Sequence, residues 1–249
     1  MVKSAYAKQY NELTARHWWW ISRRDLILQL VRQRLKNRST GEILDVGCAG
    51  GQMLQELVAL GRVTGVEPDM NLAEEAAKHE EFHLIPESIE NAPLETGRYD
   101  LALALDVIEH IENDLGALRK IHGSLKPGGQ LILTVPALAS LWSEHDVANK
   151  HFRRYEKKQL MGVLREAGFQ VELCRFFFFW TVFPFLLRRW LFRADPADSK
   201  KAEQYEVKIP PSSINAILTA YSSLEHHVAV GLPFPCGTSL LAIAVKKGD

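Results

Sequence analysis

The chain has 249 residues, of which 47% are hydrophobic and 24% are charged, a composition typical of a globular protein with a sizeable core. Its 30 basic residues balance its 30 acidic residues, whereas a nucleic-acid-binding protein usually carries a basic excess. The charge balance therefore argues against nucleic acid as a partner.

Three widely spaced cysteines, Cys48, Cys174 and Cys236, form neither a disulfide framework nor a zinc-binding pattern. We therefore expect no metal and a reducing compartment. The N-terminus lacks the apolar core of a signal peptide. The longest apolar run, residues 176–187, is shorter than the roughly 20 residues of a membrane-spanning helix. These features predict a cytoplasmic protein.

Strands and helices alternate along most of the chain. Residues 5–37 have a helical pattern that "HWWWISRR" interrupts, and Asp25 then provides an acidic helix start. Further helices are expected at 51–61, 71–79, 114–125, 156–168 and 214–230. Strands are expected at 41–47, 63–68, 82–85, 99–105, 130–136, 169–179 and 238–247, with "KPGG" as a turn and 195–213 as a loop.

This alternation predicts right-handed βαβ units in a doubly wound α/β sheet. The pattern breaks after residue 180, where charged and proline-containing segments begin. We therefore divide the chain into an N-terminal helical lid (1–40), a Rossmann-like core (41–180), a partly helical insertion (181–230) and a final strand of the core sheet (231–249).

The stretch "EILDVGCAGGQML", residues 42–54, places small residues where the first strand gives way to a helix. Such a turn lets the backbone approach a ligand closely, and the helix presents free N–H groups. Glu67 ends the next strand, where an acid can accept hydrogen bonds from a ribose diol. A dinucleotide G-x-G-x-x-G motif fails at Ala49 and Gln52. The turn therefore predicts a nucleoside ligand other than a dinucleotide.

Asp45, Gly47 and Gly51 fit the pattern D-x-G-x-x-x-G, and "GVEPD", "YDLALALDVIEHI" and "LRKIHGSLKPGGQLILTVP" follow in order. From about residue 40 to 175 the chain resembles the class I S-adenosylmethionine-dependent methyltransferases. The resemblance implies a mostly parallel seven-stranded sheet with an antiparallel last strand, and S-adenosylmethionine as cofactor. It also implies these cofactor-binding residues: Asp45, Gly47, Cys48, Ala49, Gly51, Glu67, Pro68, Ser88, Ile89, Leu105 and Asp106. Ala49 departs from the family pattern, which has glycine there.

The acceptor side has two candidate segments. Trp19 and Trp20, in "RHWWWISRR", either pack against the sheet or form an aromatic lid over a sulfonium cofactor and its acceptor. The loop after the fifth strand, residues 141–160, supplies His145 as a candidate general base. The same loop offers His151, Arg153, Arg154 and Tyr155 for acceptor binding, with a solvated loop of charged side chains as the alternative. His110, after the fourth strand, is a second catalytic candidate, with capping or packing as its alternative role.

Residues 176–193 join a long aromatic run to three arginines. This segment either continues the core or contacts a membrane peripherally, with apolar side chains in lipid and cations at the headgroups.

These features predict an S-adenosylmethionine-dependent methyltransferase acting on a small-molecule or lipid-linked acceptor, as a monomer or homodimer. The alternative is a non-catalytic module of the same fold that binds the cofactor or another protein. Formation of a methylated product separates the two hypotheses.

Overall fold

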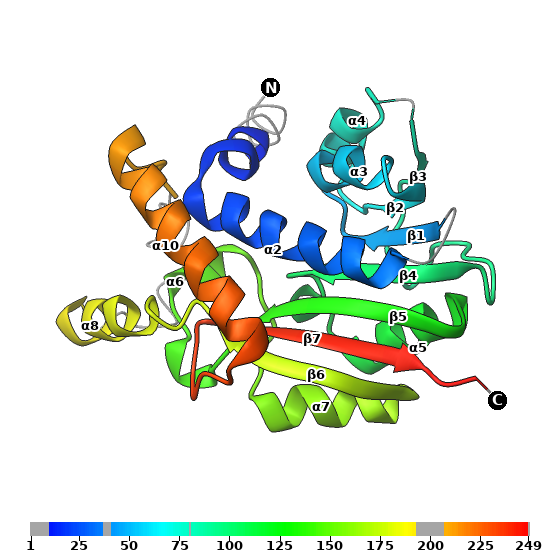
Figure 1. The fold of residues 1–249 in the computed structure, drawn as a ribbon. Coiled ribbons are helices and arrows are strands. Elements are labelled where there is room, and N and C mark those ends of the chain that lie inside the picture. Colours follow the sequence, from blue (N-terminus) through cyan, green and yellow to red (C-terminus); the bar gives the residue numbers. More distant parts are fainter. Residues whose placement is uncertain (1–9, 37–40, 80, 193–206, 249) are drawn as a thin grey trace.

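The computed structural model describes residues 10–36, 41–79, 81–192 and 207–248. Within them, one seven-stranded sheet has the order β3-β2-β1-β4-β5-β7-β6 (Figure 1). The strands are β1 (Gly41–Val46), β2 (Gly61–Val66), β3 (His83–Ile85), β4 (Tyr99–Leu105), β5 (Leu125–Pro136), β6 (Phe169–Phe177) and β7 (Ser239–Lys246). Strand β7 pairs antiparallel with both β5 and β6, and the other pairs are parallel. The predicted fold class is confirmed.

Helices cover both faces of the sheet (Figure 1). They are α2 (Trp18–Leu35), α3 (Gln52–Leu57), α4 (Met70–Ala76), α5 (Asp114–Ser124), α6 (Glu144–Ala148), α7 (Lys157–Glu166), α8 (Val182–Phe192) and α10 (Ser212–Gly231), with short 3-10 turns η1 (Ile108–His110) and η2 (Ala139–Leu141). Helices α2 and α3 pack on one face, whereas α5 and α7 pack on the other.

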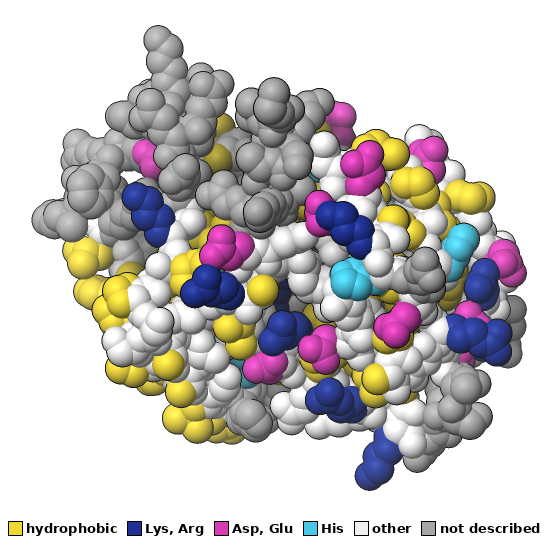
Figure 2. Space-filling model, turned by 90° about the horizontal axis from the view of Figure 1, so that it is seen from above, with side chains coloured by type: hydrophobic (Ala, Val, Ile, Leu, Met, Phe, Trp, Pro, Cys, Tyr) yellow, Lys and Arg dark blue, Asp and Glu magenta, His cyan; other side chains and the backbone are white. Residues whose placement is uncertain are grey.

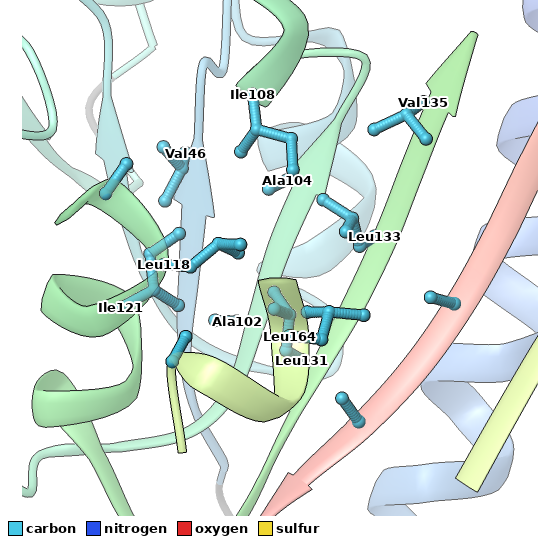
Figure 3. Packing of buried hydrophobic residues seen from close by; sticks show 14 of the residues in the cluster. Val46, Ala102, Ala104, Ile108, Leu118, Ile121, Leu131, Leu133, Val135 and Leu164 are labelled. Carbon is cyan, nitrogen blue, oxygen red and sulfur yellow. The ribbon is translucent and has the colours of Figure 1, made fainter. Parts of the chain in front are cut away.

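Strand β4 shows how the sequence builds two cores at once. Ala102 and Ala104 face the cluster under α5 and α7, whereas Leu101 and Leu103 face the cluster under α2 and α3. Figure 3 shows the first cluster, in which the small alanines of β4 lie close to the larger side chains of the neighbouring elements. A parallel strand covered on both faces is apolar throughout, and this explains the run "LALAL".

The start of α2 differs from the prediction. The three tryptophans lie in the first turn of α2, and the interruption is at His17, whose ring accepts a hydrogen bond from Trp19 N (3.2 Å). The predictions that "HWWWISRR" interrupts the helix and that Asp25 starts it were therefore wrong. Helix α10 supports this junction from the far end of the chain, because Trp18 N donates to Asn215 Oδ1 (2.9 Å) and Asn215 Nδ2 donates to Arg16 O (2.8 Å).

One other local prediction was wrong, and another concerns residues that the structure mostly does not describe. The "KPGG" segment lies inside β5 rather than in a separate turn, with Gly128 at a φ of +76°. Most of the expected loop 195–213, and Arg193, lie outside the described residues. Helix α10 confirms the predicted helix at 214–230.

Candidate functional site

A cavity of about 670 Å³ opens at the carboxyl ends of β1, β2, β4 and β5. This is the edge of a doubly wound sheet where ligands usually bind, and the volume suits a small-molecule ligand. The turn after β1 forms part of its wall, and the first turn of α2 contributes a second part. The loop after β3, the η1 turn, the start of α6 and the segment before α8 also contribute to the wall.

The turn after β1 has the backbone that a closely held ligand requires. Gly47 has a φ of +71°, and a Cβ there would lie 2.4 Å from Val107 Cγ2. Gly51, at +85°, caps α3. Ala49 also has a positive φ, +49°, which L side chains rarely adopt. Gly47 and Ala49 line the cavity, and their backbone forms a cradle in its wall that a ligand can contact closely.

Glu67 locks this turn to the end of β2. Its Oε2 accepts from Ala49 N (2.8 Å) and its Oε1 from Asp69 N (2.9 Å). Burial raises the pKa of Glu67, and these two backbone hydrogen bonds oppose the rise. A carboxylate has about four acceptor positions, so two remain for ribose hydroxyls. The arrangement fits a nucleoside in this half of the cavity.

The end of β4 carries an ion pair that the sequence did not reveal. Asp106, at a φ of +56°, pairs with Arg23 of α2. The guanidinium of Arg23 also lies over the Trp19 ring, 4.5 Å from its centroid. Trp19 stacks on Phe178, with ring centroids 5.6 Å apart. These contacts fix the start of α2 across the cavity.

A second polar group lies beyond Asp106. Glu109 and His110, from η1, line the cavity with His145 and His151 from the loop after β5. His151 Nδ1 lies 2.9 Å from Asp146 Oδ1. The rings of His110 and His151 meet edge to face at 4.6 Å. Two chain segments thus converge on one patch of titratable side chains.

The pKa values of several side chains in and beside this patch are strongly shifted. Burial raises the pKa of Glu109 to about 8. Desolvation of the ring, together with nearby His151, lowers the pKa of His110 to about 4. Burial would raise the pKa of Asp146, but hydrogen bonds from His151 and Arg154, and the charge of Arg154, lower it to about 2. At neutral pH the structure therefore favours a neutral His110 and an ionised Asp146.

Most of the predicted site residues line the cavity. The lining set comprises Gly47, Ala49, Glu67, Pro68, Ser88, Ile89, Leu105, Asp106, His110, His145, His151, Trp19 and Trp20. The predicted residues that do not line the cavity are Asp45, Cys48, Gly51, Arg153 and Tyr155. Arg153 pairs with Asp114 (2.8 Å), and the buried Tyr155 hydroxyl donates to the same carboxylate (2.7 Å).

Sequence reasoning missed several polar lining residues, among them Arg23, Glu109 and Asn149. Glu109 had a usable signal, because it immediately precedes His110 in "DVIEHI". Arg23 and Asn149 reach the cavity only through the packing of α2 and of the loop after β5. Nothing in their local sequence indicates that placement.

Thr181 and Phe185 line the cavity. Helices α8 and α10 each carry exposed large apolar side chains, which are Phe183, Leu186 and Leu187 on α8 and Ile214, Ile217, Tyr221, Leu224 and Val228 on α10. In Figure 2, hydrophobic side chains gather toward the left edge, on the side of the molecule that carries these helices. None of the helices in the described residues combines the length and apolar character needed to span a bilayer.

Comparison with known proteins identifies the family. Residues 17–173, more than half of the chain, match the family model described as a methyltransferase domain. The chain is 28% identical over 169 residues to a ubiquinone biosynthesis O-methyltransferase of Xanthomonas axonopodis pv. citri, covering 58% of this chain and 69% of the relative. It is 29% identical over 213 residues to the mitochondrial ubiquinone biosynthesis O-methyltransferase of Rattus norvegicus, covering 69% and 61%.

Solved structures share the fold at low sequence identity. An S-adenosylmethionine-dependent methyltransferase from Mesorhizobium loti matches with a TM-score of 0.57 and 15% identity, covering 87% of this chain and 96% of that chain. A Haemonchus contortus phosphoethanolamine N-methyltransferase 2, in complex with S-adenosylmethionine, matches with a TM-score of 0.58 and 17% identity. The match covers 89% of this chain and 52% of that chain. The family match, the fold and the cradle at the carboxyl edge of the sheet agree, and the chain belongs to the methyltransferase-domain family, as a class I enzyme that uses S-adenosylmethionine.

Proposed function

We propose that this enzyme methylates a hydroxyl oxygen of a small molecule that also has an apolar part. The observation that carries the proposal is the patch of Glu109, His110, His145 and His151 in the same cavity as the nucleoside-type cradle. A hydroxyl group must lose its proton during methylation, so imidazoles at the reacting end suit an oxygen acceptor. Two curated relatives are named O-methyltransferases, which supports oxygen over nitrogen or carbon.

We assign the cofactor to the half of the cavity nearer β1 and β2. Glu67 would bind the ribose hydroxyls, Ser88 and Ile89 would flank the adenine, and the backbone from Gly47 to Ala49 would pass under the methionine part. Bound S-adenosylmethionine supplies an electrophilic methyl group on a sulfonium. Trp19 and Trp20 line the cavity, and the Arg23–Asp106 pair would hold the start of α2 in place beside the cofactor.

The acceptor would lie beside η1 and the loop after β5. Asp106 and Glu109 are three residues apart at the end of β4, so the two halves of the cavity adjoin. The protein's main contribution to the transfer is alignment of the nucleophile and exclusion of water. We assign proton removal to His145, which lines the cavity, has its ring 6.1 Å from that of His151, and lies within 3.1 Å of the Asn149 amide.

Helix α8 suggests where the apolar part of the acceptor would lie. Phe185 lines the cavity, while Phe183, on the same helix, is 72% exposed. The aromatic run at 176–179 is split, because Phe177 is 1% exposed and Phe179 is 40% exposed. The segment is thus core at its start and surface further on. A lipid-linked acceptor reaching the cavity along α8 from a membrane is the second candidate.

Sedimentation with anionic liposomes tests this second candidate. Peripheral membrane contact predicts co-sedimentation of the wild-type protein at low salt, and weaker binding of Phe183→Ser. The control is Phe152→Ser, since Phe152 is 53% exposed and belongs to the loop after β5 instead of α8. If the protein stays in the supernatant at low salt, the membrane-delivered acceptor is refuted and the soluble acceptor remains as the proposal.

Methyl-labelled S-adenosylmethionine tests the main proposal. The purified enzyme is incubated with panels of phenols and catechols, and with matched amines and thiols. We expect label on oxygen, and we expect His145→Gln to slow transfer while leaving S-adenosylhomocysteine affinity unchanged. Label on nitrogen or sulfur alone would contradict the assignment of an oxygen acceptor. Cofactor binding without any labelled product would favour the non-catalytic alternative.

A further inference from the structure

We propose that Glu109, His110 and His151 form a binding site for a divalent transition-metal ion at the acceptor end of the cavity. Each side chain offers one ligand atom, and these three atoms all lie within 4.8 Å of one another. One carboxylate with two imidazoles is a ligand set that first-row transition ions favour over magnesium or calcium. The metal site itself does not depend on the proposed function. Only the identity of the molecule at the ion's remaining coordination positions rests on that function.

The carboxylate of Glu109 lacks the partners that a buried acid normally has. Its side chain is 0% exposed, and neither oxygen has a hydrogen-bond partner among the described residues. The two nearby guanidinium groups are already engaged, since Arg23 pairs with Asp106 and Arg154 with Asp146. An unpaired buried carboxylate is costly, and a bound cation would offset that cost.

The two imidazoles are oriented as metal-binding histidines usually are. His151 uses Nδ1 toward Asp146 (2.9 Å), which leaves Nε2 for a cation. A hydrogen bond between the His110 ring and the backbone of Asn149 opposes the fall of the His110 pKa and leaves the other ring nitrogen for a cation. A metal-bound histidine almost always donates its second N–H to a carboxylate or a carbonyl in this way.

The supporting shell is itself held firmly. Asp146 Oδ2 accepts from Ser143 N (2.8 Å) and from Ser143 Oγ (3.0 Å), and Arg154 Nε donates to Asp146 Oδ1 (2.8 Å). Phe152 N donates to Glu109 O (2.8 Å), which ties the histidine loop to η1. Both chain segments that supply ligands are therefore fixed relative to each other.

Three protein ligands leave open positions, as in catalytic zinc sites. The acceptor oxygen would take one of them. A cation at this place lowers the pKa of a bound hydroxyl, so the O–H bond breaks more readily. The proton would pass to His145, which is outside the three ligands and partly open to solvent. The oxygen would use the electron pair left behind to form the new bond to the methyl carbon, while the methyl–sulfur bond breaks and S-adenosylhomocysteine leaves with its electron pair.

Metal titration of the chelator-treated, full-length protein tests the site. Zn²⁺ binding is measured by calorimetry, and Co²⁺ binding by visible absorption. We expect one ion per chain, a Co²⁺ spectrum typical of nitrogen and oxygen ligands, and much weaker binding of Mg²⁺. Glu109→Gln and His151→Ala should each weaken Zn²⁺ binding by at least about tenfold. His83→Ala, which removes an exposed imidazole on β3, should not change it.

The outcomes are separable. Absence of saturable Co²⁺ binding, or unchanged Zn²⁺ affinity in both ligand variants, would overturn the metal site. If circular dichroism shows that a variant does not fold, the binding stoichiometry and the Co²⁺ spectrum of the wild-type protein still test the metal site. Metal-free protein that binds S-adenosylhomocysteine and transfers methyl to oxygen at the full rate would refute the part assigned to the metal in the transfer, and would leave the proposed function standing. Saturable metal binding without S-adenosylhomocysteine binding would instead refute the proposed cofactor placement.

Discussion

Replacing Glu67 with glutamine tests the proposed cofactor site most sharply by mutation. The side chain is 6% exposed, and each of its oxygens already accepts one backbone hydrogen bond. The substitution keeps the shape of the side chain but removes its charge. The amide nitrogen of glutamine is a donor, so it cannot accept the hydrogen bond from the backbone N–H that faces it. A hydrogen bond to a charged group contributes about 1.5–3 kcal/mol. We therefore expect S-adenosylhomocysteine affinity to fall by roughly 10- to 150-fold.

Isothermal titration calorimetry with S-adenosylhomocysteine measures this change. Glu87→Gln is the matched control, because Glu87 is exposed and follows the neighbouring strand β3. The control should bind like the wild type. Equal affinities of the Glu67→Gln variant and the wild-type protein would refute the reasoning, since they would mean that this carboxylate does not contact the ligand.

Three further substitutions test the turn and its surroundings. Ala49→Val should weaken S-adenosylhomocysteine binding by about tenfold or more, because a β-branched residue disfavours the positive φ, while Ala49→Gly should bind at least as well; equal affinity of the Val variant would mean that this residue faces away from the ligand. Burial and the nearby charge of Glu67 raise the pKa of Asp45 to about 7, so the folded state binds its proton more tightly than the unfolded chain does, and stability falls as pH rises from about 4 to about 7. Asp45→Asn should flatten that fall in urea unfolding of the ligand-free protein, and an unchanged pH profile would contradict the shifted pKa. Tyr155→Phe should lower the free energy of unfolding by about 1.5–3 kcal/mol through the lost bond to Asp114 without changing S-adenosylhomocysteine affinity, and the reverse pattern would place Tyr155 in the site.

The sequence predicted the sheet and the turn after β1 because both depend on local patterns. The turn from Gly47 to Gly51 and the acid at Glu67 are set by backbone conformation at strand ends, which short motifs record. Strand β4 was predicted at its observed bounds, Tyr99–Leu105, because burial on both faces makes the whole segment apolar.

The acceptor half could be predicted only in part, because it depends on packing between distant segments. His145 and His151 were found from the density of titratable residues after β5. Arg153 belongs to the same cluster in sequence, yet its guanidinium turns to Asp114 instead of the cavity. The neighbouring Arg154 lines the cavity and pairs with buried Asp146. Adjacent residues in a loop point in different directions, and the sequence alone does not determine which one faces a cavity.

The α2 boundary failed for a related reason. Three consecutive tryptophans have modest helix propensity, so the segment looked like an interruption. In the structure, the rings of Trp18 and Trp19 pack against Phe178, and Asn215 from α10 accepts the Trp18 N–H. Tertiary contacts with residues some two hundred positions away therefore start the helix earlier than its local sequence indicates.

A crystal structure of the complex with S-adenosylhomocysteine tests the central claim, which is that one cavity holds the cofactor beside β1 and β2 and the acceptor beside η1. We predict that the ribose hydroxyls lie within hydrogen-bond distance of Glu67, the adenine lies beside Ser88 and Ile89, and the sulfur faces the patch of Glu109, His110 and His151. A ligand whose ribose avoids Glu67, or whose sulfur faces away from that patch, would contradict the account.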